Sequence, residues 1–351
     1  MAQNYPKRIE MQEGIDLLLS HTERMGREKV AVNEAYGRIL ACRIRAKENI
    51  PPFDRSPYDG YAIRSADVAG AGHDTPVTLR IIEEVPAGHA PEKVLGPMEA
   101  VKILTGAPIP QGADAVEKYE DTSFTEKEVC FFSPIASGSN IVKAGEDVKK
   151  GEIVMEEGEY LSPASVGLLA GLGYGEAEVF KKPTVRIIST GDELLQVSEE
   201  LKPGKIRNSS AYMLQGFLRQ WGITADIYGI VRDDQAAIEE ALTTCLQDAD
   251  CVITTGGASV GDYDLALASM EGIGAEVLFW QVKMKPGMAT LASVKDGKLL
   301  LGLSGNPSAA AAALFLLGLP AFRKMCGKKE YKVPCIPVCL PDGFPKKSPG
   351  G

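Results

Sequence analysis

Polar loops that each follow a predicted strand constrain this chain more than any other feature. From about residue 184 onward, apolar runs typical of strands alternate with helical periodicity. This alternation predicts an α/β fold with a mostly parallel, doubly wound sheet covered by helices on both faces. In such a sheet the loops after the strands gather at the carboxyl edge, where ligands bind. The loops are residues 190–193, 207–208, 255–262, 285–287 and 304–307.

These loops combine residue types that suit a phosphorylated substrate and a divalent metal. The carboxylates supply the oxygen ligands that Mg²⁺ prefers, and the glycines let backbone amides approach a phosphate. The last loop begins a helix whose free amides can hold an anion. The residues are Asp192, Glu193, Asp262, Gly256, Gly257, Gly261, Ser304, Gly305 and Asn306. We therefore expect an enzyme that handles a phosphorylated or nucleotide-linked substrate.

Each motif also has a simpler explanation. An acid near a helix N-terminus is favoured by about 0.3–1 kcal/mol without any ligand, and a turn can need glycine for its own conformation. Asn306 before Pro307 is a typical helix start. Two adjacent acids, with Asp262 on a neighbouring loop, fit Mg²⁺ better than capping does, so we interpret them as a metal site.

The first half of the chain has a different character. Apolar spacing predicts an opening helix over residues 11–25 and a second helix over 32–44, which Pro51 and Pro52 end. Residues 53–148 are rich in glycine and proline and contain short β-like runs, which predicts a small β-rich module. The expected strands are 77–85, 100–104 and 129–132, and a further short helix follows Ser162.

The second half is predicted element by element. Strands are expected at residues 184–189, 226–231, 251–254 and 276–280, with a hairpin of 289–294 and 299–303. Helices are expected from Ser210, through 238–245, near Asp264 and from Asn306.

Composition excludes several classes of protein. A chain of 351 residues favours two or three domains, and its net charge of -9 argues against general binding of nucleic acid or of an anionic membrane. The longest apolar run, residues 309–319, is shorter than a membrane span and is expected to be a buried helix. No secretory signal is visible and the seven cysteines are scattered, so we expect a cytoplasmic location.

Several longer segments resemble the molybdopterin molybdenumtransferase (MoeA) family, to which eukaryotic gephyrin is related. The matching segments are residues 53–64, 105–110, 112–116, 140–148, 189–194, 203–209, 254–263, 284–287 and 302–309. The resemblance implies an elongated subunit of several domains that acts as a homodimer, with its site shared between subunits. The implied domains are a helical and linker domain (6–50 and 146–181), an inserted β-rich domain (51–145), an α/β molybdopterin-binding domain (182–328) and a short tail (329–351), remnant of a C-terminal β-barrel.

The resemblance also implies the reaction. Enzymes of this family insert molybdate into adenylylated molybdopterin with Mg²⁺-dependent release of AMP, and a molybdopterin adenylyltransferase is an implied partner. At the matching positions, Asp59, Glu193 and Asp262 would form an acidic catalytic centre that holds the metal, Asp192 would be a further metal ligand, and Lys285 would neutralise an oxyanion. The implied substrate-binding residues are Thr105, Asp147, Asn208, Gly256, Gly257, Ser259, Gly261, Ser304, Gly305 and Asn306.

Three positions depart from the family pattern. Met288 stands where many relatives have a second lysine, and Asn208 stands where several have aspartate, which removes a metal charge. Residues 142–143 are Val-Lys, where relatives often have an arginine-rich pair. These departures weaken the anion-site and metal-site assignments at those positions.

Three alternative functions share part of the pattern. Molybdopterin adenylyltransferases and a class of related pyrophosphatases have the α/β domain with its glycine loop, but they lack segments like residues 53–64 and 105–110. A non-catalytic scaffold, a role that gephyrin also plays, would not need the acids Asp59, Glu193 and Asp262. The sequence therefore favours insertion, and it does not separate molybdenum from tungsten.

Overall fold

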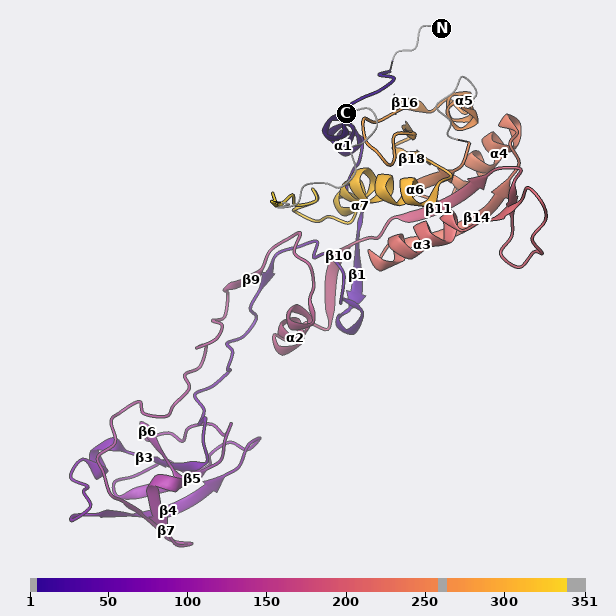
Figure 1. Ribbon diagram of the computed structural model, residues 1–351. Coiled ribbons are helices and arrows are strands. Elements are labelled where there is room, and N and C mark those ends of the chain that lie inside the picture. The colour runs from indigo at the N-terminus through magenta and orange to yellow at the C-terminus, as the bar shows by residue number, and fades with distance from the viewer. Residues whose placement is uncertain (1–4, 258–263, 340–351) are drawn as a thin grey trace. The chain divides into compact units, whose positions relative to one another are not determined.

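The computed structural model describes residues 5–257 and 264–339. The chain forms two compact units (Figure 1). Unit 1 comprises residues up to Cys42, Glu157–Pro163 and the chain from Glu176 onward. Unit 2 comprises Arg43–Glu156 and Ala164–Gly175. The chain therefore passes from one unit to the other four times.

Unit 1 is built on a mixed six-stranded sheet with strand order β14-β11-β15-β18-β17-β16. The first four strands in this order are parallel to their neighbours, and β17 and β16 add an antiparallel edge. The strands are β11 (Thr184–Thr190), β14 (Thr224–Val231), β15 (Cys251–Thr255), β16 (Glu276–Phe279), β17 (Thr290–Lys295) and β18 (Lys298–Leu303). The predicted strands and hairpin of the second half are thus confirmed to within a few residues.

Successive residues of the central strands enter two different apolar clusters. Ile187 and Ile253 belong to the larger cluster, whereas their neighbours Ile188 and Val252 belong to the other. Because successive side chains of a strand point to opposite faces, both faces of the sheet are buried. Helices α1 (Met11–Ser20), α3 (Ser210–Gln220), α6 (Pro307–Ala313) and α7 (Leu319–Met325) contribute to the first cluster, and α4 (Gln235–Cys245) and α5 (Leu265–Gly272) to the second.

Helices α4 and α5 of unit 1 each begin at a capping side chain. Asp234 accepts a hydrogen bond from the Ala237 amide, and Asp264 accepts one from the Leu267 amide. These caps satisfy amides that have no partner inside the helix. The predicted helices near residues 238 and 264 are therefore confirmed, with starts that local chemistry sets.

The apolar stretch Pro307–Met325 is helical throughout, because a π-helical turn, Leu314–Gly318, joins α6 to α7. Among the described residues it alone is long and apolar enough to cross a membrane by length and composition. More than half of it is buried, and α6 and the turn pack on α3, β18 and α1. This is the environment of a core helix, as the sequence predicted.

The predicted helix over residues 32–44 is wrong. Strand β1 (Arg27–Ala31) pairs antiparallel with β10 (Glu176–Phe180), and a short 3₁₀ turn, Val32–Glu34, follows it. Isolated bridges then join Ile39 to Tyr160 and Leu40 to Val179. The stretch is held by backbone partners more than 100 residues away in sequence, which local periodicity does not reveal.

Unit 2 contains a second six-stranded sheet, with order β6-β3-β5-β4-β8-β7. Apolar clusters that include Tyr61 and Ile63 on one side, and Ala62 and Val101 on the other, fill its interior. The strands of this sheet are β3 (Gly60–Ile63), β4 (Val77–Val85), β5 (Glu99–Ile103), β6 (Ala115–Lys118), β7 (Thr122–Phe124) and β8 (Glu128–Phe131). The predicted β-rich module is confirmed as a sheet of this extent.

Smaller elements complete the two units. Strand β12 (Leu194–Leu195) pairs in parallel with β13 (Ile206–Arg207) beside the main sheet of unit 1. Strand β2 (Ile44–Arg45) pairs with β9 (Ile153–Met155) in unit 2. The remaining elements are α2 (Pro163–Gly171) and 3₁₀ turns at Ser65–Val68 and Tyr119–Asp121.

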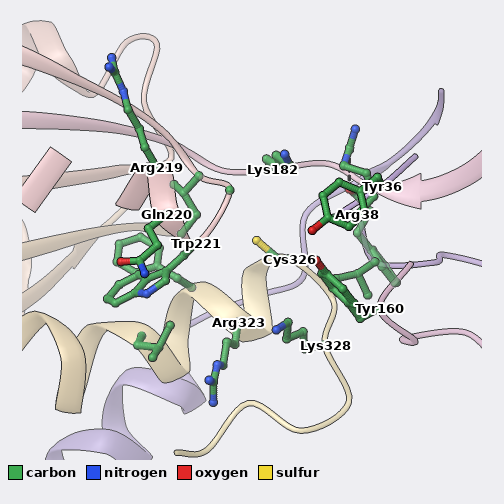
Figure 2. A pocket seen from close by; sticks show the side chains of 17 residues that line it. Tyr36, Arg38, Tyr160, Lys182, Arg219, Gln220, Trp221, Arg323, Cys326 and Lys328 are labelled. Carbon is green, nitrogen blue, oxygen red and sulfur yellow. Dashed lines mark hydrogen bonds between the residues drawn. The ribbon is translucent and has the colours of Figure 1, made fainter. Parts of the chain in front are cut away.

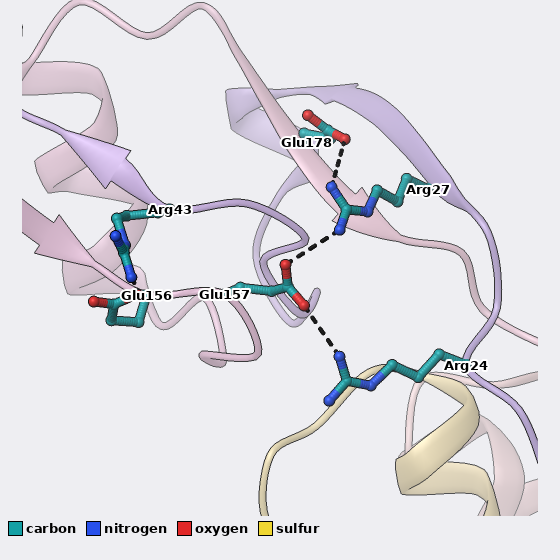
Figure 3. Close-up of polar contacts among 6 residues, drawn as sticks. All are labelled: Arg24, Arg27, Arg43, Glu156, Glu157 and Glu178. Atoms are coloured by element: carbon teal, nitrogen blue, oxygen red, sulfur yellow. Dashed lines mark hydrogen bonds and ion pairs between the residues drawn. The ribbon is translucent and has the colours of Figure 1, made fainter.

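Ion pairs lie beside one of the crossings between the units (Figure 3). Within unit 1, Glu157 contacts Arg24 at 3.0 Å and Arg27 at 3.2 Å, and Arg27 also contacts Glu178 at 3.5 Å. Within unit 2, the glutamate that precedes Glu157 contacts Arg43 at 2.9 Å. These side chains are largely exposed, so each pair contributes about 0–1 kcal/mol.

Candidate active site

A pocket of about 300 Å³ lies at the carboxyl edge of the parallel strands in unit 1. Its walls come from the loops that follow β11, β15 and β18 and from the β12–β13 ladder. The lining residues are Thr190, Glu193, Leu194, Ile206, Arg207, Asn208, Ser209, Ser210, Thr255, Gly256, Gly305, Asn306 and Pro307. Four of the five loops singled out in the sequence therefore contribute to one pocket.

The backbones of these loops are in direct contact, and glycine makes this contact feasible. Gly256 has φ of 90°, and a Cβ there would lie 2.1 Å from the carbonyl oxygen of Thr190. A Cβ on Gly305 would lie 3.5 Å from the Gly256 Cα. No other residue fits at position 256 without moving backbone, so the glycine is required by packing as well as suited to ligand approach.

The Thr190 hydroxyl is a buried polar atom beside this glycine. It has no hydrogen-bond partner among the described residues, and Thr190 itself is 2% exposed. A buried hydroxyl without a partner is costly and is rare away from functional sites. Its position in the pocket wall supports a polar ligand there.

Asn208 and Ser210 connect the pocket to helix α3. The Asn208 side-chain oxygen accepts hydrogen bonds from the Ser189 hydroxyl at 3.1 Å and the Ala211 amide at 3.4 Å. The Ser210 hydroxyl donates to the Gly305 carbonyl at 3.1 Å. Asn208 is thus fixed by the protein itself, and its neutral amide holds the start of α3 where an aspartate would add charge.

Asn306 serves as the cap of α6. Its side-chain oxygen accepts hydrogen bonds from the amides of Ser308 and Ala309 at 3.0 and 3.3 Å. The simpler explanation of this motif therefore accounts for the Asn306 side chain. Ser304 accepts a hydrogen bond from the Asn306 amide and lies next to the pocket lining.

An acidic loop adjoins the pocket. The Asp192 amide donates to Asp233 at 3.3 Å, and the Asp233 amide donates to Asp192 at 3.4 Å. Glu193 lines the pocket, and its carboxylate folds back over Gly191, where a Cβ would lie 2.5 Å from it. Partial burial, with the charges of Asp192 and Glu193, raises the pKa of Asp233.

Asp233 was missed by sequence reasoning. It follows β14, so it belongs to the same class as the loops that follow β11, β15 and β18. The signal was available, because Arg232, Asp233 and Asp234 come directly after a predicted strand. Asp234 is the helix cap, which leaves Asp233 as the additional acid at this edge.

The donor chemistry of this loop suits a hard cation. Mg²⁺ takes oxygen ligands and commonly binds through one or two carboxylates plus substrate phosphates. Among the described residues, no three acids, cysteines or histidines lie close enough to form a complete metal site by themselves. The expected residues Ser259, Gly261 and Asp262 lie outside the described residues. The described acids suit a Mg²⁺ site in which a bound substrate supplies the remaining oxygen ligands.

Asp59 and Thr105 are brought together in unit 2. The Thr105 amide and hydroxyl both donate to one Asp59 carboxylate oxygen, each at 2.7 Å. These two bonds, the amide first, lower the pKa of Asp59. Gly60 follows at the start of β3, where a Cβ would lie 1.9 Å from the Glu117 carbonyl oxygen. The carboxylate is thus held ionised on a fixed strand end.

Lys285 and Asp147, which were expected in the site, are not joined to the candidate acids of their own units. Lys285 is exposed, and Gly287 of its loop lies near α6, where a Cβ would be 3.4 Å from the Ala309 carbonyl oxygen. Asp147 is exposed, and its amide bonds to the Ile50 carbonyl. Among the described residues, no hydrogen bond or ion pair joins Lys285 to Glu193 within unit 1, or Asp147 to Asp59 within unit 2.

Comparison with known proteins assigns both parts of the chain. Residues 9–173 match the family described as "MoeA N-terminal region (domain I and II)", and residues 186–324 match the "Probable molybdopterin binding domain". The class of protein is therefore one that combines the MoeA N-terminal region with a probable molybdopterin-binding domain, and the pocket lies in the second of these.

Similarity to individual proteins identifies the family within this class. The chain is 39% identical over 341 residues to a molybdopterin molybdenumtransferase of Staphylococcus aureus (strain Mu50), which covers 97% of this chain and 81% of the relative. It is 38% identical to that of Staphylococcus epidermidis over the same length. A crystal structure of the molybdopterin biosynthesis moeA protein from Pyrococcus horikoshii OT3 is similar, with 36% identity, a TM-score of 0.81 and coverage of 93% and 82% of the two chains. The chain belongs to the molybdopterin molybdenumtransferase (MoeA) family.

Proposed function

We propose that this protein inserts molybdenum from molybdate into adenylylated molybdopterin and releases AMP. The observation that carries the proposal is the glycine-lined pocket with an acidic loop at its rim, in a chain of this family. The pocket offers an unpartnered hydroxyl and close backbone to a substrate phosphate, while the acids face where a cation would be needed. The proposal takes the mixed sheet to be of the doubly wound type, which the apolar clusters on both faces support.

The proposed roles of the residues in unit 1 rest on their positions around the pocket and, for Asp262, on the family resemblance alone. Thr190, Gly256 and Gly305 would contact the pterin phosphate, and Glu193 and Asp192 would hold Mg²⁺, with Asp262 completing the set. Asp233 would keep Asp192 in place, because the backbone amide of each residue donates a hydrogen bond to the carboxylate of the other. Bound there, Mg²⁺ would neutralise charge on the phosphoanhydride.

The roles of the exposed lysine and of unit 2 are proposed on the family resemblance. Lys285 would neutralise an oxyanion, and Thr105 would contact the molybdate end of the substrate while it orients Asp59. Asp59 lies in the inserted module of residues 51–145 and would complete the acidic centre of a second subunit. Asp147 and Ser304 remain substrate-binding candidates. A two-fold dimer would then hold two such shared sites.

The reaction is tested by measuring AMP release from adenylylated molybdopterin with and without molybdate and Mg²⁺. We expect release to need both, and molybdenum cofactor to accumulate in step with AMP. Release that is independent of molybdate would contradict insertion. Net consumption of ATP with free molybdopterin would indicate the adenylyltransferase alternative, against which the match of residues 9–173 speaks.

The shared site is tested by mixing two inactive variants. Asp59→Ala and Glu193→Ala should each be inactive alone. After random subunit exchange, about half of the dimers would be heterodimers with one complete site each, so activity should return to about one quarter of wild type. If exchange is confirmed by mass spectrometry and no activity returns, each site lies within one chain.

A further inference from the structure

A second, larger pocket of about 510 Å³ lies in unit 1, away from the carboxyl edge (Figure 2). Lys182 comes just before β11 and Ile223 just before β14, so the pocket lies at the amino edge of the parallel strands. Residues 36–39, Tyr160 and the end of α7 complete its wall. None of these residues belongs to the candidate active site.

The pocket gathers positive charge around one half-buried thiol. Arg38, Lys182 and Lys328 all act electrostatically on Cys326, which Figure 2 shows between the two lysines. Burial nevertheless raises the pKa of Cys326 to about 11, so the thiol is neutral near pH 7. The three cations therefore converge on a group that does not balance their charge.

The two lysines also lack a carboxylate in direct contact: Glu28 acts on Lys182 only as the weakest of its electrostatic neighbours. Arg38 is paired with Glu28 and donates to the Phe180 carbonyl at 2.8 Å. Among the described residues, Lys182 and Lys328 have no carboxylate partner, and no aspartate or glutamate lines the pocket. Burial, then a neighbouring arginine, lowers the pKa of both lysines. In a chain with net charge of -9, this is a local site for an anion.

Aromatic side chains form two opposite walls of the pocket. Trp221 lies on one side and the pair Tyr36 and Tyr160 on the other, with Lys182 and Lys328 between them in this view (Figure 2). The two tyrosine rings are 6.4 Å apart in an edge-to-face arrangement, and Trp221 is supported by Phe217 at 6.3 Å. The rings are thus braced on each side. Such walls can stack against a flat aromatic ring, whereas a bare oxyanion would make no use of aromatic contacts.

We propose that this pocket binds a mononucleotide, with its phosphate between Lys182 and Lys328 and its base against Trp221. The two lysines donate charge-assisted hydrogen bonds to the phosphate, and Arg38 adds to the positive field. The volume is within the range of small-molecule sites, about 300–1,000 Å³. This site is independent of the reaction at the carboxyl edge.

The test uses the whole protein, AMP as the probe and Trp221 fluorescence as the readout. AMP should change the emission of Trp221, and this change should be absent in Trp221→Phe, which leaves only Trp280. Because the readout comes from the amino edge and needs no turnover, it separates this site from any AMP bound as a product at the active site. No AMP-dependent change from Trp221 would overturn the proposal.

Paired lysine variants locate the phosphate. Lys182→Gln with Lys328→Gln should weaken AMP binding by about tenfold or more, because two charge-assisted bonds are lost. The matched control is Lys181→Gln with Lys329→Gln, which changes the adjacent lysines that do not line the pocket and should bind as wild type. Lys182→Arg should retain binding, and thermal unfolding should confirm that each variant is folded.

Smaller probes test each half of the ligand. Adenosine and inorganic phosphate should each bind about tenfold or more weakly than AMP. Equal affinity for phosphate and AMP would overturn the nucleotide assignment, because the ring would then contribute nothing. Equal AMP affinity of the paired lysine variant and its control would overturn the phosphate position.

Discussion

The two edges of the sheet in unit 1 carry opposite charge and are built in opposite ways. At the carboxyl edge, Glu193 lines a pocket walled largely by loop backbone, and the mutually bonded Asp192 and Asp233 lie in the adjoining loops. Arg207 is the one basic residue in the described lining. At the amino edge, Lys182 and Lys328 lie among aromatic side chains. The carboxyl edge would contact a ligand mainly through loop backbone, and the amino edge through charged and aromatic side chains.

The difference shows which groups each edge lacks. The carboxyl edge combines close loop backbone and the unpartnered Thr190 hydroxyl, which suit an anion, with carboxylates, which repel one. A cation between acid and phosphate reconciles these two features, so we expect this edge to bind metal and phosphate together. In the described part of the chain, the charged residues that line the amino-edge pocket are all basic, so that pocket needs an anion alone.

The largest expected effect comes from the backbone contact at the carboxyl edge. Gly256→Ala forces a Cβ to within 2.1 Å of the Thr190 carbonyl, so it should destabilise the fold by about 3 kcal/mol or more. Gly222→Ala at the amino edge meets only the flexible end of Lys182 and should cost about 1–2 kcal/mol from its positive φ. Urea denaturation measures both, and equal losses would remove the contrast between the edges.

The next effect is on activity. Glu193→Gln keeps the shape of the side chain but removes a ligand charge, so AMP release should fall by about 100-fold or more while substrate binding persists. The matched control is Glu200→Gln, an exposed acid on the following loop that does not line the pocket. A Glu193→Gln enzyme with wild-type turnover would leave Glu193 without a catalytic role.

A smaller effect concerns pH. The pKa of Asp233 is raised, so the folded state holds its proton more tightly than the unfolded state, and stability falls as pH rises above 3.8 through the folded pKa. Asp233→Asn should remove this loss, by less than about 1 kcal/mol because the group is exposed and screened. Free energies of unfolding at pH 4 and pH 7 measure it. An unchanged difference between the two pH values would show that Asp233 is not repelled by its neighbours.

The smallest effect is expected at the amino edge. The pKa of Lys182 is lowered, so its charged form is disfavoured in the fold. Lys182→Met should therefore be neutral or stabilise the ligand-free protein by about 0.5 kcal/mol. Differential scanning calorimetry without nucleotide checks this, with Lys181→Met as the control. A clear loss of stability would mean that Lys182 has a structural partner.

Local patterns predicted the elements of the second half well, because each strand and helix there carries its own signal. Asn306 and Asp264 mark helix starts by cap chemistry, and both predictions are confirmed. Strands β1, β10, β12 and β13 were not predicted, because their pairing partners are distant or their length is only two residues. Long-range pairing leaves little trace in local periodicity.

The candidate site was predictable in part for the same reason. The loops that line the pocket follow strands of a parallel sheet, so topology alone brings Glu193, Gly256 and Gly305 to one edge. Asp233 satisfies that rule too, since it follows β14, but the loop after that strand was not singled out from the sequence. The pocket around Lys182 was not predictable, since it combines segments from both ends of the chain at the amino edge.

The four crossings between the units also set an order of events during synthesis. Nearly all of unit 2, residues Arg43–Glu156, leaves the ribosome before β10 and β11 of unit 1 exist. The inserted module can therefore complete its sheet first, while the first 42 residues wait for partners from residue 176 onward. We expect ribosome-bound chains arrested after residue 215 to show a protease-resistant module of unit 2 beside a cleavable N-terminal segment. Unit 1 would then be completed late, when its N-terminal segment pairs with the chain from residue 176 onward and so closes a long loop.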